Sequence, residues 1–139
     1  MGYRCQGQAR EIESTEAALR ACDHEAAHAM AMRLAAARQA FLEVVDFMVV
    51  HARTDPNAAY AGSVPYLLLA GNLVAGWQLG RALLVARRKL AAGEDTGFMR
   101  DKIAIARFYA EHLLTRVPGL RDSVVAGAAA VNDVAVEAF

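Results

Sequence analysis

Residues 64–80 read VPYLLLAGNLVAGWQLG, and Asn72 and Gln78 are the only polar residues among them. At about 100° per residue, Gln78 shares one arc of a helix with Arg81 and Arg88, whereas leucines occupy most of the remaining circumference. A helix with a single polar stripe is typical of a bundle in which the helix is covered on more than one side. The stretch therefore predicts a long helix at the centre of a helical fold.

The same stretch has a second interpretation, as a membrane span. Its apolar part is short against the ~20 residues that cross a bilayer, although the basic run Arg87-Arg88-Lys89 would suit an inner flank. Gly76 and Gly80 permit close helix packing in water as well as in lipid. Because the polar stripe continues along the helix, we favour the bundle interpretation and expect no membrane partner.

Prolines and glycines divide the rest of the chain into helical segments. Pro56 lies in a turn-rich connection, Gly93 suits a helix C-cap with Asp95 or Thr96 as the next N-cap, and Pro118-Gly119 separates the last two helices. We find no alternation that predicts a strand. The predicted helical segments are 10–53, 64–92, 97–117 and 119–136.

Apolar residues in these segments recur at helical spacing, which predicts amphipathic helices joined by short connections. Such helices favour an all-α fold, an antiparallel four-helix bundle. The first helix is long, and Cys22-Asp23-His24 can break it near residue 23, with Asp23 capping the second piece. We expect residues 1–9 to form a disordered or extended N-terminal tail and residues 10–139 to form a single helical-bundle domain.

Composition narrows the classes of partner. Fifteen basic and fifteen acidic residues cancel, so there is no electrostatic footprint for nucleic acid. Cys5 and Cys22 form neither a disulfide framework nor a metal clip. The N-terminal residues lack the apolar core of a signal peptide. These features predict a cytoplasmic protein with two free thiols and no nucleic-acid partner.

One short motif indicates an enzyme. His24-Glu25-Ala26-Ala27-His28 matches the zinc-hydrolase pattern H-E-x-x-H, in which two histidines hold the metal and the glutamate activates water. A zinc hydrolase also needs a third protein ligand and an open position for water. Glu94, Glu111 and His112 supply that ligand only if the fold brings one of them near. Since an acidic residue also suits a helix start, we predict no catalytic, cofactor-binding or metal-binding residue.

Two longer stretches carry a resemblance to a known family. Residues 64–93 and 101–131 resemble the helical domain appended to the C-terminus of one branch of bacterial acyl-CoA dehydrogenases, and residues 33–63 resemble that domain's first helix and linker. The similarity extends over about residues 10–139. The positions that carry it are Pro65-Tyr66-Leu67, Gly71, Gly76-Trp77, Lys102, Ala106-Arg107-Phe108-Tyr109-Ala110 and Glu111.

The resemblance implies a non-catalytic module. Full-length members of the family are FAD enzymes that introduce a double bond into acyl-CoA thioesters, and their flavin site and catalytic glutamate lie upstream of the appended domain. Nothing in this sequence matches those parts, so we carry over no catalytic residue and expect this chain to bind no FAD. Such a module would serve packing and oligomerisation, either within a larger dehydrogenase or as a stand-alone copy.

We therefore expect a homo-oligomer or a complex with a dehydrogenase core. The surplus apolar surface of residues 64–92 would form the contact, with Tyr66, Leu69, Leu73 and Trp77 close to it or beneath it. Two alternatives stay open: zinc hydrolysis through His24, Glu25 and His28, and a bundle that holds an acyl or CoA-type ligand between its helices.

Overall fold

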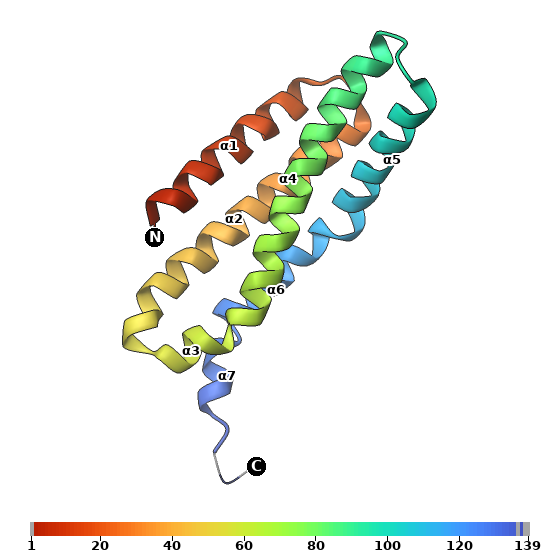
Figure 1. Ribbon diagram of the computed structural model, residues 1–139. Helices are drawn as coiled ribbons and strands as arrows, with labels where there is room; N and C mark the ends of the chain where they lie inside the picture. The colour runs from red at the N-terminus through yellow and green to blue at the C-terminus, as the bar shows by residue number, and fades with distance from the viewer. Residues whose placement is uncertain (1, 136, 138–139) are drawn as a thin grey trace.

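The computed structural model describes residues 2–135 and 137, and every regular element in them is helical (Figure 1). This confirms the predicted all-α class. Four helices are long: α1 (Gly2–Ala21), α2 (Glu25–Thr54), α4 (Ser63–Ala91) and α5 (Thr96–His112). The short elements are α3 (Pro56–Ala61), the 3₁₀ turn η1 (Leu114–Arg116), α6 (Val117–Val125) and α7 (Ala128–Asn132).

The long helices lie side by side, and each reverses the direction of the one before it (Figure 1). α4 lies against both α2 and α5, and α6 continues below α5 to cover the other end of α2 and α4. α1 covers only part of the groove between α2 and α4, because it is shorter than either of them. The N-terminal half of α4 is therefore left open on that side.

The break near residue 23 is present, but the residue that caps α2 is His24 and not Asp23. His24 has extended backbone (φ −162°), and its Nδ1 accepts the backbone N–H of Ala26 at 3.2 Å. An N-cap side chain must reach a donor two or three residues ahead. Asp23 stands one position too early to do so.

The N-terminal residues differ from the expectation of a tail. α1 begins at Gly2, so residues 2–9 are part of this helix in the structure. Ala9 and Ile12 are buried, and once such a turn is docked, elongating the helix costs little. Residue 1 of the expected tail and residues 136, 138 and 139 of the expected domain lie outside the described residues.

The connection around Pro56 contains a short helix that the sequence did not reveal. Pro56 is the first residue of α3, where its missing N–H costs nothing. Asp55 caps the same helix by accepting the N–H of Ala58 at 3.2 Å. The turn signals at this point thus mark a helix start as well as the end of α2.

The turn between α4 and α5 follows the prediction closely. Gly93 lies directly after the capping residue Ala92 and has φ +75°, which only glycine adopts without strain. Its N–H and that of Glu94 donate to the carbonyls of Leu90 and Lys89, which satisfies the end of α4. Asp95 occupies the N-cap position of α5, although its side chain makes no capping bond.

The third predicted segment ends earlier than expected. α5 stops at His112 and not near residue 117, and Pro118 lies in the first turn of α6. A proline inside a helix removes one hydrogen bond and clashes with the preceding turn, so α5 ends before Pro118 and the chain passes through a 3₁₀ turn. The last predicted segment, 119–136, is divided between α6 and α7 at Gly127, and residue 136 is outside the described residues.

One apolar core joins α1, α2, α4, α5 and α6. Leu69 and Leu73, expected near a contact with a partner, belong to this core and are almost fully buried. Burying each such leucine contributes about 1.5–3 kcal/mol. The largest fully buried apolar side chains are Leu19, Met30, Leu34, Val44, Leu69, Leu73, Leu83, Leu114, Val117 and Val124.

Candidate functional site

Two of the H-E-x-x-H residues make other contacts at the start of α2. His24 is the N-cap residue, and its Nδ1 accepts the backbone N–H of Ala26, so this nitrogen is engaged in capping the helix. Glu25, the residue that would activate water, accepts a hydrogen bond of 2.7 Å from the guanidinium group of Arg107. The side chains of His24 and Glu25 are thus engaged in a helix cap and an ion pair at the start of α2.

Arg107 lies between two of the predicted metal-site carboxylates. It donates to Glu25 from α5 to α2 at 2.7 Å and to Glu111 one turn along α5 at 3.1 Å. Both hydrogen bonds raise the pKa of Arg107, and the bond to Glu25 has the larger effect. The carboxylates of Glu25 and Glu111 are therefore paired with the guanidinium cation of Arg107 in place of a zinc ion.

The other predicted ligands lie elsewhere. Glu94 pairs with Lys89 at 3.2 Å, and His112 stacks on Phe108 with ring centroids 4.4 Å apart. Within the described part of the chain, no group of three or more His, Cys, Asp or Glu residues is arranged to hold a metal ion. The geometry does not support zinc hydrolysis.

A buried ion cluster joins α1 to α2, and sequence reasoning missed it. Glu16 is fully buried, and Arg38 donates to both of its oxygens, from Nε at 2.8 Å and from a terminal nitrogen at 3.2 Å. Arg20 approaches the same carboxylate at 3.4 Å. The hydrogen bond to Glu16 raises the pKa of Arg38. The only sequence signal was the Glu16–Arg20 spacing of four, which usually marks an exposed pair.

A second polar contact joins α1 to α4. The indole N–H of Trp77 donates to the Thr15 hydroxyl at 2.9 Å, and Thr15 donates to the carbonyl of Glu11. Beside Trp77 is a cavity of about 160 Å³, lined largely by apolar side chains that include Phe41 and Tyr66. We call Thr15, Glu16, Arg20, Arg38 and Trp77 the α1 seam.

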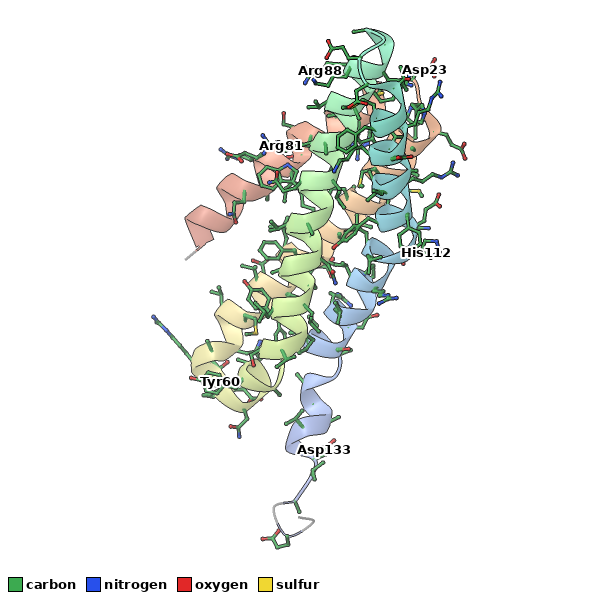
Figure 2. All side chains as sticks on the ribbon, turned by 45° about the vertical axis from the view of Figure 1, so that its right-hand side comes forward. Asp23, Tyr60, Arg81, Arg88, His112 and Asp133 are labelled. Atoms are coloured by element: carbon green, nitrogen blue, oxygen red, sulfur yellow. The ribbon has the colours of Figure 1, made fainter. Side chains whose placement is uncertain are left out.

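Large apolar side chains are exposed on the N-terminal half of α4. Val64 is 66% exposed, Leu67 72%, Leu68 54% and Val74 45%. The C-terminal half of the helix exposes Arg81 and Arg88 instead, on the side towards α1 (Figure 2). The predicted polar stripe is therefore present, but the apolar part of α4 is not fully covered by the rest of the chain.

The neighbouring helix α5 also exposes large apolar side chains. Phe98, Ile105 and Phe108 are each about half exposed. The hydroxyl of Tyr109 donates to Oδ1 of Asn72 at 3.2 Å and so ties α5 to the middle of α4. We call the large exposed apolar residues of the N-terminal half of α4 and of α5 the α4–α5 face: Val64, Leu67, Leu68, Val74, Phe98, Ile105 and Phe108.

α4 also meets the length and composition criteria for a membrane span. Only 28% of its most apolar window is buried within the described structure. Core helices of water-soluble proteins satisfy the same criteria, so a single helix of this kind is weak evidence for a membrane.

A shallow hollow lies at the other end of α4. Its volume is about 610 Å³, and it is lined by Cys22, Arg87, Arg88 and several aliphatic side chains. Cys22 is a free thiol, whereas the side chain of Cys5 is outside those described. The hollow combines an apolar wall with two cations.

Comparison with known proteins supports the resemblance read from the sequence. Residues 8–135 match the family described as "Acetyl-CoA dehydrogenase C-terminal like". The chain is 51% identical over 89 residues to the 3-methylmercaptopropionyl-CoA dehydrogenase of Ruegeria pomeroyi. It is 35% identical over 79 residues to the broad-specificity linear acyl-CoA dehydrogenase FadE5 of Mycobacterium tuberculosis.

These matches cover much of this chain but little of either relative. They span 64% and 52% of the chain, and only 15% and 13% of the respective dehydrogenases. The similarity therefore concerns one segment of much longer proteins.

Proposed function

The chain belongs to the acetyl-CoA dehydrogenase C-terminal-like family, and from this premise we propose that it is a non-catalytic module that packs against a dehydrogenase core or against another copy of itself. In this proposal α1, α2, α4 and α5 act as an antiparallel four-helix bundle. The observation that carries the proposal is the α4–α5 face, because seven large apolar side chains on two adjacent helices are left exposed.

Several features of the α4–α5 face support a role in packing. Apolar patches on monomeric proteins rarely exceed about 300–600 Å², and larger ones mark sites of interaction. Residues 63–80, which supply the α4 part, include no charged side chain. Interface centres are depleted of charge and enriched in aromatic residues, and Phe98 and Phe108 provide the aromatic contribution here.

Catalysis would then reside outside this module. The cavity beside Trp77, at about 160 Å³, is small against the ~300–1,000 Å³ of ligand pockets, so its residues do not fit FAD. The hollow beside Arg87 and Arg88 is larger, at about 610 Å³, but it is shallow and does not enclose a ligand. Under this proposal FAD and any acyl-CoA substrate bind to a dehydrogenase core. The free thiol of Cys22 supports a reducing compartment, and we propose the cytoplasm.

Light scattering of the purified chain over a wide concentration range tests the packing role. We expect self-association, and we expect the double variant Leu68→Glu/Phe108→Glu to be monomeric because it places two carboxylates on the α4–α5 face. Met32→Glu is the matched control, since Met32 is 59% exposed on α2 and is outside that face. Equal circular dichroism spectra would show that all variants fold.

The size of the native polypeptide in its own cells distinguishes the two forms of the proposal. An immunoblot band near 14.9 kDa indicates a free module, and a much larger band indicates a segment of a dehydrogenase. A free module that stays monomeric at every concentration would contradict the proposal.

The hollow beside Arg87 and Arg88 favours a second candidate function, the binding of a CoA-type ligand. Its cations could meet phosphate groups and its apolar wall an acyl chain. A ligand that binds only the folded state must raise the melting temperature. A thermal-shift series with acyl-CoAs of different chain length tests this, and the absence of any shift at high excess removes it.

A further inference from the structure

Gly71 lies at the centre of the exposed side of α4, and nothing in this chain explains its lack of a side chain. A Cβ added at Gly76 would lie 2.7 Å from Leu114, and one added at Gly80 would lie 3.2 Å from Leu19. At Gly71 an added Cβ would meet no atom within 4 Å. A glycine inside a helix lowers stability relative to alanine. An added Cβ would be equally free at Gly97 and Gly119, but Gly71 differs from them because it lies among exposed large apolar side chains.

The residues around Gly71 are arranged symmetrically. Leu68 and Val74 lie three residues to either side of it, and Leu67 and Ala75 lie four residues to either side. Positions three and four residues apart share a face of a helix. If α4 crosses an antiparallel copy at Gly71, Leu68 meets the copy's position 74 and Leu67 meets its position 75. Both pairings place a larger side chain against a smaller one.

We propose that two copies of this chain pair through α4, antiparallel and about a two-fold axis that passes through Gly71. This inference rests on the proposed packing function and specifies the partner and the point of contact. Helix axes ordinarily lie about 8–10 Å apart, and a glycine at the crossing lets the two backbones approach more closely than that. A two-fold contact uses the same patch on both copies, as the symmetric spacing requires.

Charge favours a second copy as the occupant. At the two-fold axis a side chain meets its own counterpart, and residues on either side of the axis meet residues from the same stretch of the copy, so a charged residue at the axis would meet a like charge. Residues 63–80 have none, and the first charged residue on the exposed side is Arg81, ten positions from the axis. The exposed surface of residues 63–80 can therefore contact the same surface of a second copy without repulsion between like charges.

The available area is also consistent with pairing. From their exposed fractions, Val64, Leu67, Leu68 and Val74 together with the neighbouring Tyr60 expose an apolar area on the order of 500 Å², within the range of the largest patches on monomers. A specific dimer buries about 800 Å² from each partner. The exposed area of these apolar side chains and of the polar residues around them, which include Ser63 and Gln78, approaches this size.

Cysteine cross-linking tests the axis directly. Gly71→Cys is made in the full chain with Cys5→Ser and Cys22→Ser, and copper phenanthroline in air serves as the oxidant that converts two thiols to a disulfide. A disulfide joins Cα atoms about 4.4–6.8 Å apart, which suits a close crossing at position 71. The added side chain weakens the reversible pairing, but each disulfide that forms is retained, so we expect most of the protein to accumulate as a disulfide-linked dimer. Gly97→Cys is the matched control, since Gly97 is also exposed with no atom within 4 Å of an added Cβ. It should cross-link at least tenfold more slowly.

An alanine at the same position gives a second readout. Gly71→Ala should raise the melting temperature of the dilute monomer, because alanine favours the helix, and should weaken dimerisation at least tenfold, because the methyl groups collide at the crossing. Gly97→Ala should raise the melting temperature and leave dimerisation unchanged. A structural role of Gly71 within one chain would instead lower the melting temperature.

The outcomes separate this inference from the proposed function. If Gly71→Cys does not cross-link and Gly71→Ala dimerises as the wild type does, the two-fold pairing is wrong. Loss of assembly in Leu68→Glu/Phe108→Glu would then still uphold the packing role with another contact or another occupant, such as a dehydrogenase core. A wild-type chain that never self-associates overturns the pairing at once.

Discussion

The α1 seam and the α4–α5 face distribute their polar and apolar groups in opposite ways. Inside the seam a carboxylate is fully buried and held by two arginines, and an indole donates to a hydroxyl. On the face, leucine, valine, isoleucine and phenylalanine side chains are about half exposed or more. The seam is therefore a contact completed within the chain, whereas the apolar side chains of the face are left exposed by it.

The seam also shows how a polar helix can be fixed in place. Buried ion pairs add little net stability compared with apolar packing, but they are costly to break because a buried charge is left without its partner. Bonds from Arg38 and Trp77 to α1 therefore set the position of that helix more than they strengthen the fold. The α4–α5 face consists of apolar side chains, so under the proposed packing function its partner would be selected by shape and apolar area.

Glu16→Ala is expected to have the largest effect and would test whether the seam is a complete contact. Removing the carboxylate leaves the largely buried Arg38 with only the longer contact to Glu13, which should lower the free energy of unfolding by about 3 kcal/mol. Urea denaturation measures it. Glu13→Ala is the matched control: Glu13 is 61% exposed and 3.8 Å from Arg38, so its loss should cost less than about 0.5 kcal/mol. Equal losses from the two variants would mean that the burial of Glu16 does not matter.

Gly76→Ala is expected to have the next largest effect and contrasts the two sides of α4. The added methyl group would lie 2.7 Å from Leu114, and overpacking of this kind costs about 1–3 kcal/mol. Thermal unfolding followed by circular dichroism measures the change. A gain in stability would show that α6 and the 3₁₀ turn move aside easily, and it would remove the contrast with Gly71.

The cap of α2 predicts a smaller, pH-dependent effect next to the seam. Burial first, and then the positive charge of Arg87, lower the pKa of His24 below 6.5. Just below pH 6.5, His24 therefore binds a proton in the unfolded chain but not in the folded chain. The contribution of His24 to stability is complete above pH 6.5 and is lost as the pH falls through the pKa of His24 in the folded chain. We expect a loss of up to about 1 kcal/mol, the size of one N-cap.

Unfolding measured across this pH range, compared between the wild type and His24→Asn, isolates the contribution of the cap. Asparagine caps helices without titrating near neutral pH, so this variant should lose that part of the pH dependence. An unchanged pH profile would assign the effect to other groups.

The smallest effect is expected on the α4–α5 face. Leu67→Ala should change the stability of the dilute monomer by less than about 0.5 kcal/mol, as exposed substitutions do, because Leu67 is 72% exposed. Leu69→Ala, two residues away in the core, should cost about 2–5 kcal/mol. Denaturation at low concentration measures both, and similar losses would show that Leu67 is covered within the chain.

The helices were predictable because their signals are local. Apolar spacing and the glycine at position 93 identified α4 and its end, and Cys22-Asp23-His24 identified the break before α2. Pro118 was ambiguous, since a proline suits the start of one helix as well as the end of another. Its true position depends on how α6 packs, which the local sequence does not encode.

The two surfaces were less predictable because they depend on packing between distant segments. Glu16 and Arg38 are separated by 22 positions, and a glutamate in a polar helix is ordinarily exposed. The apolar character of residues 64–80 was plain, but which leucines would be covered depended on where α1 and α5 came to lie. The H-E-x-x-H string shows that local spacing alone does not define a site, since Nδ1 of His24 caps α2 and Glu25 pairs with Arg107 of α5.

Trp77 gives the chain an internal optical probe. It is the single tryptophan of the protein, and its indole nitrogen is bonded to a hydroxyl of α1. Its fluorescence emission therefore depends on whether the first helix is seated, independently of the backbone signal from the other helices. Loosening of α1 could thus be followed in real time without attaching any dye.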